Sequence, residues 1–398
     1  MAGTPLRPTL VVIPTLMLDG SFSAPLAWMF APCPDRVRGV YGFELTRELV
    51  EAHHRFVVEL SWFIELHEFG LIVDFIRAHN PAAEILFGGM YAGIVYPEIF
   101  RRYRVDYFIR GDNELPLRLF VEGEAAERIP NLTGRRLENP LGYIFGERDF
   151  DGLDFDLSWF PGYHRHRNRR ERFPLPHLVT FKGGCNSVHD GCDYCAGSKA
   201  GTLCRLFGRG PLTMPAGSLL TLLARVERRF QEVSLYLTRA GEYPFDGQRF
   251  DLDATIEIDS RSSPAQVAGL FRAFRKAYVL VSAYAEGLSG ETACPQIYEA
   301  MMDLEDQDHV LRFYVMKKDA RALGIPADHV MYSDLAFPRA AEWSFYTDVD
   351  RALAFSQRFY RTCPRHFVDG TPVLEPANPS YMWQCIAFSQ GYPEREAR

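Results

Sequence analysis

The 398-residue sequence has no apolar run that approaches the roughly 20 residues needed to cross a bilayer. Its N-terminus also lacks the apolar core and the small-residue cleavage site of a signal peptide. No internal repeat and no low-complexity tract is found along the sequence. These absences predict a cytoplasmic protein that does not bind membranes.

Basic residues are not in excess in this chain. Lysine and arginine number 44 against 51 aspartates and glutamates, which gives a net charge of −7. Binding to nucleic acid without sequence preference needs a basic face, so we expect no nucleic-acid partner. Hydrophobic residues make up 47% and charged residues 24%, which excludes wholesale disorder and coiled coil. At roughly 150 residues a domain, the length predicts two or three domains.

Cysteine is scarce, because eight residues in 398 are too few for a disulfide scaffold. Five of them are scattered without paired spacing, and we expect buried, reduced thiols at Cys33, Cys204, Cys294, Cys363 and Cys385. The other three, Cys185, Cys192 and Cys195, lie close together. They carry most of the functional interpretation.

The N-terminal part of the chain alternates apolar runs with helical patterns. We expect strands at 9–15, 55–61, 84–89 and 105–110, and helices at 43–51, 66–79 and 96–102. This alternation predicts a Rossmann-like parallel sheet that binds ligands at the carboxyl ends of its strands. Prolines at 14, 25, 32 and 34 predict a loop over 16–42 and therefore a shortened domain.

A connector with many Pro, Gly, Asp and Arg residues follows over 126–176. Five arginines gather in 164–172 and offer positive charge to an anionic ligand or partner. Charge runs of this kind are usually solvated loops, which is the interpretation we favour.

A second series of strands and helices begins after the connector. We expect strands at 178–181, 233–237, 254–258, 278–282, 311–316 and 330–334, and helices at 216–229, 264–275 and 295–304. Six such units predict a partial (β/α)6 barrel of TIM type, whose site lies at the carboxyl ends of the strands. The expected domains are residues 1–125, a linker at 126–176, the barrel at 177–345 and a C-terminal extension at 346–398, which opens with a helix at 349–361.

The cysteine cluster has the spacing C-x6-C-x2-C and directly follows the first barrel strand. Flanking glycines allow the backbone to wrap a bulky centre. Three thiolates suit an iron–sulfur cluster with one iron left open, whereas a closed zinc site needs a fourth ligand such as His189 or Cys204. A redox C-x2-C pair would leave Cys185 unused. The place at the end of a barrel strand favours the iron–sulfur cluster.

This segment resembles the cluster loop of radical S-adenosylmethionine (SAM) enzymes, including the aromatic Tyr194 before the last cysteine. That family usually has C-x3-C-x2-C, so three residues are extra here. The resemblance implies that Cys185, Cys192 and Cys195 hold a 4Fe-4S cluster whose open iron binds SAM. Reduction of SAM would then give a 5′-deoxyadenosyl radical, which abstracts a substrate hydrogen.

Polar residues at the next strand ends resemble the SAM-binding positions of this family. The second barrel strand ends in Arg-Ala-Gly-Glu, similar to a Gly-Gly-Glu-Pro turn, and the third and fourth end in polar residues. A turn or capping role is the alternative for each. The implied SAM contacts are Tyr194, Gly241, Glu242, Glu257, Asp259, Arg261 and Ser282.

The N-terminal part resembles the cobalamin-binding branch of the same superfamily. The landmarks are Ser61-Trp62 and the stretches 81–89, 105–114, 129–133 and 139–141. No Asp-x-His-x-x-Gly follows the first strand, so cobalamin would be held without a histidine on cobalt. The implied cobalamin contacts are Thr15, Ser61, Trp62, Gly88, Gly89, Gly111 and Asp112.

The resemblance implies methyl transfer to an unactivated carbon of a small-molecule substrate, with a reductant such as flavodoxin or ferredoxin as partner. One alternative is a rearrangement, dehydration or epimerisation without cobalamin. An alternative of another class is a non-catalytic subunit that holds zinc and binds a partner. Aromatic residues and one histidine of the barrel-end loops and tail are candidates for substrate contact: Tyr284, Tyr332, Trp343, His366, Tyr381 and Trp383.

Overall fold

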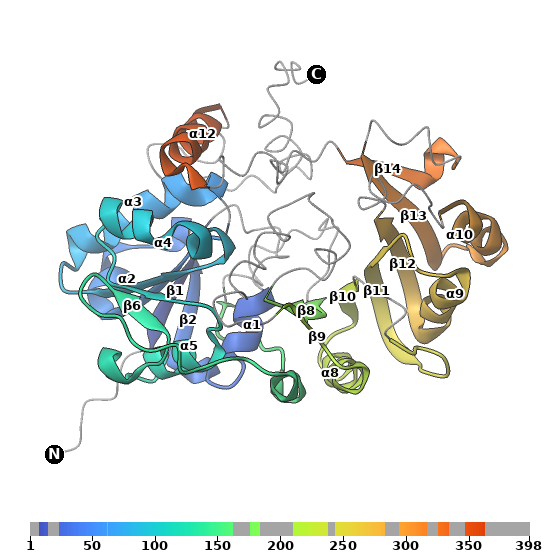
Figure 1. Cartoon of the computed structure of the whole chain (residues 1–398), viewed down its shortest axis with the longest axis horizontal. Helices are drawn as coiled ribbons and strands as arrows, with labels where there is room; N and C mark the ends of the chain where they lie inside the picture. Colours follow the sequence, from blue (N-terminus) through green and yellow to red (C-terminus); the bar gives the residue numbers. More distant parts are fainter. Residues whose placement is uncertain are drawn as a thin grey trace. The chain divides into compact units, whose positions relative to one another are not determined.

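A computed structural model describes most of the chain: residues 8–14, 24–61, 63–161, 176–183, 210–237, 243–282, 294–316, 325–333 and 347–362. The chain divides into two units. Unit 1 comprises Met1–Phe145, Asp154–Glu171 and Glu342–Tyr381, and unit 2 comprises Gly146–Leu153, Arg172–Ala341 and Met382–Arg398. Each unit is built on a parallel sheet with helices (Figure 1), which confirms the predicted α/β class.

The sheet of unit 1 has the order β2-β1-β3-β4-β5-β6, with all pairs parallel except β5 and β6. Its strands are β1 (Thr9–Ile13), β2 (Val37–Tyr41), β3 (Arg55–Glu59), β4 (Glu84–Gly88), β5 (Tyr107–Ile109) and β6 (Leu132–Gly134). The chain leaves β1 for β2 on one side and returns to β3 on the other. The carboxyl ends of β1 and β3 therefore form the topological switch point, where open α/β sheets bind ligands.

Helices cover both faces of this sheet (Figure 1). The α-helices are α1 (Ala24–Phe30), α2 (Arg47–Ala52), α3 (Leu66–His79), α4 (Met90–Arg102), α5 (Glu114–Val121) and α12 (Val349–Thr362), and the 3-10 helices are η2 (Pro34–Arg36), η3 (Gly42–Glu44), η4 (Phe63–Glu65) and η5 (Ala126–Arg128). All five residues of β1 are buried, as are Phe56 to Val58 of β3 and Ile85 to Phe87 of β4. A parallel sheet covered on both faces needs such continuous apolar strands.

The predicted loop over 16–42 is wrong, because α1 and β2 lie there. Pro25 falls in the first turn of α1, and Pro34 opens η2. Proline is tolerated at such positions because the N–H that it lacks has no partner within the helix. The domain is therefore not shortened at this point. The next helix, α2, begins at Arg47, where the Thr46 side chain caps it by accepting from the Leu49 N–H.

Six parallel strands of unit 2 follow one another in chain order, β7-β10-β11-β12-β13-β14. They are β7 (His177–Val179), β10 (Glu232–Leu237), β11 (Phe250–Asp259), β12 (Phe274–Ser282), β13 (His309–Met316) and β14 (Val330–Ser333). The helices are α8 (Ala216–Glu227), α9 (Pro264–Ala273) and α10 (Cys294–Met301), with 3-10 helices η6 (Glu147–Gly152), η10 (Met302–Leu304) and η12 (Ala327–His329). A short antiparallel pair, β8 (Phe181–Lys182) and β9 (Leu212–Thr213), stands apart from the main sheet. The six parallel strands in chain order are those expected for the partial barrel, and α8, α9 and α10 are the three helices predicted between them.

The two faces of the unit 2 sheet differ in polarity. Along β11, Leu252, Ala254, Ile256 and Ile258 are buried and alternate with half-buried polar residues. The apolar face packs on helices such as α9, where Ser263 caps the first turn and Pro264 opens it. The opposite face is the polar one.

The last described helix, α12, belongs to unit 1 although it follows unit 2 in the sequence. It packs on α3 and η4, where the Phe355 and Phe63 rings meet at 5.5 Å. The buried Ser356 hydroxyl accepts from the His67 N–H at 2.9 Å. None of the helices in the described ranges is long and apolar enough to span a membrane.

Candidate functional site

The cysteine cluster lies outside the described residues, as do several other predicted contacts and the arginine run 164–172. These residues are Cys185, Cys192, Tyr194, Cys195, Gly241, Glu242, Thr15 and Trp62, with Tyr284, Trp343, His366, Tyr381 and Trp383 among the substrate candidates. Among the described residues, no group of three or more His, Cys, Asp or Glu side chains is arranged to hold a metal ion. Cys33 and Cys294 are buried thiols, as expected, and burial raises the pKa of Cys33.

The two ends of the cysteine segment lie together at the carboxyl end of β7. β8 precedes the cysteines and pairs with β9, which follows them. The Met214 N–H donates to the Thr180 carbonyl at 2.7 Å, and the Tyr243 hydroxyl donates to the Met214 carbonyl at 3.1 Å. The Thr180 hydroxyl in turn donates to the Tyr236 carbonyl on β10. The described residues on either side of 184–209 therefore lie beside the first two strands of the sheet.

Glu257 and Ser282 meet on the polar face of this sheet, near the carboxyl ends of β11 and β12. Register pairs Asp259 with Ser282, which places Glu257 one step earlier on the same face. The Ser282 hydroxyl donates to Glu257 Oε1, and Ser282 is only 9% exposed. A carboxylate and a hydroxyl so placed can accept from the hydroxyl and ammonium groups of a ligand.

Asp259 and Arg261, also predicted as SAM contacts, form the turn after β11. Asp259 Oδ1 accepts from the Arg261 N–H at 3.2 Å and from the Ser262 hydroxyl at 3.4 Å. This is the turn role that was the alternative for these residues. Tyr332, a predicted substrate contact, lies in β14.

Sequence analysis missed His177 on the same polar face. Its Nδ1 lies 2.8 Å from the Ser234 hydroxyl, and the two residues are register partners on β7 and β10. Burial lowers the pKa of His177 to about 4, so the ring is neutral at pH 7. A single histidine at the start of a short strand gives no sequence signal that it will be buried on this face.

In unit 1, two buried glutamates accept hydrogen bonds from Ser61 at the carboxyl end of β3. Glu59 is 6% exposed and its Oε1 accepts from the Ser61 hydroxyl at 2.7 Å. The Ser61 N–H donates to Glu65 Oε2 at 2.9 Å. Burial raises the pKa of Glu59 to about 7, against the opposing effect of the Ser61 hydrogen bond. Among the described residues, Glu59 Oε2 has no hydrogen-bond partner.

The two glycines at the end of β4 have different roles. Gly89 has a φ of +120°, and a Cβ there would lie 2.5 Å from the Leu60 carbonyl oxygen, so only glycine fits this turn. A Cβ on Gly88 would meet nothing within 4 Å among the described residues. Gly88 is the register partner of Glu59, so this open space lies beside the buried carboxyl group. Of the predicted cobalamin contacts, Gly88 and Ser61 are thus brought together.

Gly111 and Asp112, also predicted cobalamin contacts, form the turn after β5. Gly111 turns the chain at a φ of +82°. Asp112 is buried, and its Oδ2 accepts from the Phe145 N–H at 2.8 Å. The Asn131 amide also donates to the Asp112 carbonyl. These bonds fix the segment that leads from β5 into β6.

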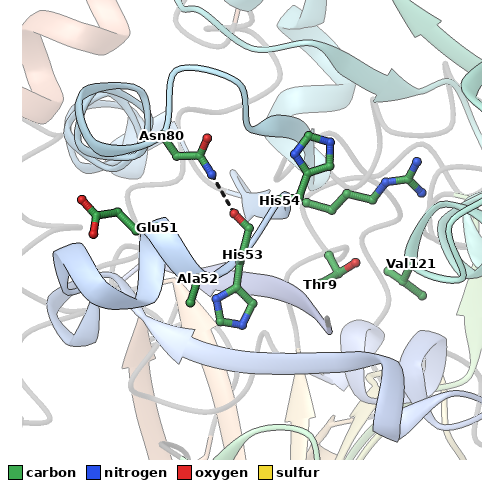
Figure 2. A pocket seen from close by; sticks show the side chains of 8 residues that line it. Thr9, Glu51, Ala52, His53, His54, Asn80 and Val121 are labelled. Carbon is green, nitrogen blue, oxygen red and sulfur yellow. Dashed lines mark hydrogen bonds between the residues drawn. The ribbon is translucent and has the colours of Figure 1, made fainter. Parts of the chain in front are cut away.

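An open pocket of about 400 Å³ lies at the amino edge of the same sheet (Figure 2). It is lined by Thr9, Glu51, Ala52, His53, His54, Arg55, Asn80 and Val121. Arg55 binds Glu84 at 2.7 Å and the carbonyls of Phe120 and Glu124, and the Asn80 amide donates to the His53 carbonyl at 2.7 Å. Its polar groups therefore hold the fold together.

No protein-family model matches the chain, and no curated protein matches it significantly. Among solved structures it is similar to OxsB, a cobalamin-dependent SAM radical enzyme with aqua-cobalamin and SAM bound. The TM-score is 0.53 at 12% identity, over 92% of this chain and 57% of OxsB. It is also similar to TsrM from Kitasatospora setae, a radical SAM methyltransferase with cobalamin and a 4Fe-4S cluster bound. That match has a TM-score of 0.52 at 12% identity, over 80% of this chain and 72% of TsrM.

A second TsrM structure, with tryptophan and a SAM analogue bound, matches with a TM-score of 0.53 at 12% identity, over 89% of this chain and 77% of that one. At this identity the likeness shows that the chain has the fold of cobalamin-dependent radical SAM enzymes. The chain spans little more than half the length of OxsB.

Proposed function

We propose that the chain is a cobalamin-dependent radical SAM enzyme that transfers a methyl group to an unactivated carbon of a small molecule. The observation that carries this function is the fold, because one chain holds two parallel-sheet units and aligns with OxsB and TsrM over most of its length. The sequence supports it independently, since C-x6-C-x2-C follows the first strand of the second sheet.

In unit 2 the residues present suit a cluster and SAM. When bound, a 4Fe-4S cluster on Cys185, Cys192 and Cys195 would supply the electron that cleaves SAM to methionine and a 5′-deoxyadenosyl radical. A reductant such as flavodoxin or ferredoxin would provide that electron. Glu257 and Ser282 would hold SAM by accepting from its ribose hydroxyls or its ammonium group.

In unit 1 the residues present suit cobalamin at the switch point. The buried Glu59 has an oxygen without a described partner, and Gly88 leaves space beside it. Bound cobalamin would supply a carrier for the methyl group between SAM and the substrate. With α1 and β2 in place, this sheet has the five parallel strands of a doubly wound nucleotide-binding fold, which supports methyl transfer over a reaction without cobalamin.

Chromatography of the nucleosides after anaerobic incubation with SAM, substrate and reductant tests the reaction. Two SAM molecules would be consumed in each turnover: one gives S-adenosylhomocysteine as it donates its methyl group, and one gives 5′-deoxyadenosine as it is reduced. We expect the two products in about equal amounts. If a cluster-replete sample forms neither of these two products, radical SAM activity is excluded.

A radical reaction without methyl transfer is the second candidate, because OxsB is described only as a SAM radical enzyme. Such a reaction would give 5′-deoxyadenosine without S-adenosylhomocysteine, or would regenerate SAM. Metal analysis distinguishes these two radical SAM reactions from the third possibility, a non-catalytic subunit that holds zinc. We expect about four irons and four sulfides per chain, whereas one zinc without sulfide would overturn the enzyme function.

A further inference from the structure

Glu59 is a buried titratable group of unit 1 that the described residues satisfy only in part. It ends β3, which is otherwise apolar from Phe56 to Val58, and it is 6% exposed. Its Oε1 accepts from Ser61, but its Oε2 has no partner among the described residues. A buried acceptor without a hydrogen bond costs about 1–3 kcal/mol, and more when it is charged. Natural folds keep such groups where something else satisfies them.

The missing partner would lie over Gly88. Glu59 and Gly88 are register partners on parallel neighbouring strands, and residues paired in this way direct their side chains to the same face of the sheet. At Gly88 there is no side chain, and the position of its Cβ is open for 4 Å among the described residues. The Glu59 side chain therefore lies beside a position without a side chain, at the carboxyl edge of the sheet. That edge is also the topological switch point.

The start of α4, next to Gly88, makes its hydrogen bonds within the fold. The N–H groups of Tyr91 and Ala92, at the start of α4, donate to the carbonyls of Ser61 and Leu60. The Ser61 N–H donates to Glu65. The usual anion site at a helix N-terminus is therefore occupied by backbone carbonyls, and the open polar group here is an acceptor. An acceptor calls for a ligand that presents N–H or O–H donors.

We propose, on the basis of the function proposed above, that Glu59 is a cobalamin-binding residue whose Oε2 accepts a hydrogen bond from a corrin amide group seated over Gly88. The rim of the corrin ring carries primary amide side chains, which present N–H donors around a flat, largely apolar ring. A glycine beside a buried carboxyl group suits both properties. The landmark Ser61 then acts as a positioning residue, because it fixes Oε1 and so directs Oε2.

Binding of hydroxocobalamin to the full-length protein tests this assignment, with the dissociation constant measured by equilibrium dialysis and corrin absorbance. Glu59→Leu keeps the size of the side chain but removes both oxygens. We expect its dissociation constant to rise about 10- to 100-fold, the effect of losing one hydrogen bond to a charged group. In Glu59→Gln the amide oxygen still accepts from Ser61, but an NH2 donor replaces Oε2 and cannot accept from the ligand, so we expect the dissociation constant to rise about tenfold.

Gly88→Ala tests the same space from the neighbouring strand, β4. One methyl group there meets nothing in the described fold, so the variant should fold normally and yet weaken cobalamin binding about tenfold or more by crowding the ligand. Gly217→Ala is the matched control, because a Cβ at Gly217 in α8 of unit 2 also meets nothing within 4 Å. Its dissociation constant should equal that of the wild type.

The possible results distinguish a failure of the Glu59 assignment from a failure of the proposed methyl-transfer function. If wild-type protein binds hydroxocobalamin and Glu59→Leu binds it equally tightly, Glu59 is not a ligand-binding residue and the proposed function stands. If Glu59→Leu and Gly88→Ala weaken binding while their melting temperatures and iron content match the wild type, the assignment holds. If wild-type protein binds no cobalamin, the methyl-transfer function and the assignment both fall, and the radical reaction without cobalamin remains.

Discussion

The two parallel sheets of this chain are built from similar units but offer ligands different places. The strands of unit 1 are apolar on both faces, so a ligand finds room only at the edge where strands end, beside Glu59 and Gly88. The sheet of unit 2 has one apolar face against helices and one face with His177, Ser234, Glu257 and Ser282. A ligand can lie along that face. We therefore expect the doubly wound sheet of unit 1 to bind at its rim and the sheet of unit 2 to bind on its polar face.

Within unit 1, the two edges of one sheet differ as well. The amino edge has the pocket and several charged groups, and Arg55 makes three hydrogen bonds there. The carboxyl edge holds a buried carboxyl oxygen without a described partner. An unsatisfied buried group indicates a binding site better than a depression whose polar groups are already satisfied.

Loss of the cluster is the largest effect that we predict. Replacement of Cys185, Cys192 or Cys195 by Ala should each abolish the broad iron–sulfur absorption after anaerobic reconstitution, because three thiolates are needed to hold the cluster. Cys33→Ala and Cys294→Ala remove buried thiols in the two units and serve as controls. A full-strength cluster in the Cys185 variant would show that the long first gap is not part of the ligand set.

Arg55→Met should separate the two edges of the unit 1 sheet. It removes the bonds to Glu84, Phe120 and Glu124 and the guanidinium group over the Phe120 ring, but keeps a long apolar side chain. We expect the free energy of unfolding to fall by about 3 kcal/mol, since partly buried charged hydrogen bonds are lost. Urea denaturation measures this loss. Hydroxocobalamin affinity should be unchanged, and a parallel loss of affinity would place the ligand at the amino edge.

Glu257→Gln tests the polar face of unit 2. The substitution keeps the size of the side chain and an acceptor for Ser282 but removes the charge that favours ligand hydroxyl or ammonium groups. We expect the dissociation constant of SAM to rise about 30-fold, or about 2 kcal/mol. Thr255→Val lies one step earlier on the same face of β11 and is the matched control. Equal SAM affinity in the wild type, Glu257→Gln and Thr255→Val would show that SAM does not bind at β11.

Much of unit 2 could be predicted from the sequence because the hydrophobic pattern of its strands differs clearly from that of its helices. All six expected strands are present, and the helix expected at 216–229 begins at Ala216 as α8. In unit 1, α3 has the predicted bounds, but α4 begins at Met90, six residues before the expected start. Proline misled the prediction over 16–42, because position within the first turn decides whether proline breaks a helix.

The sites were predicted less well, because burial and pairing are properties of the folded chain. Ser61 was identified as a landmark, but its partner Glu59 was read only as part of a strand. A glutamate in an otherwise apolar buried strand was the available signal. The packing of α12 on unit 1 and the strand β6 within the expected linker depend on long-range contacts that no local pattern encodes.

Glu59 should also make the stability of the ligand-free protein depend on pH. Its pKa is raised by burial from 4.5 to about 7 in the folded chain. Between these two values the folded protein retains a proton that the unfolded chain has lost, so the free energy of unfolding falls as pH rises. From pH 5 to pH 7 the fall is about 2 kcal/mol, and Glu59→Gln, which does not titrate, lacks it. Urea denaturation of both proteins without cobalamin at the two pH values measures the difference. Glu127→Gln, at an exposed position of η5, should follow the wild type. If Glu59→Gln and the wild type change equally with pH, the Glu59 carboxyl already has a partner in the ligand-free fold, and the rim of the unit 1 sheet needs another group to bind its ligand.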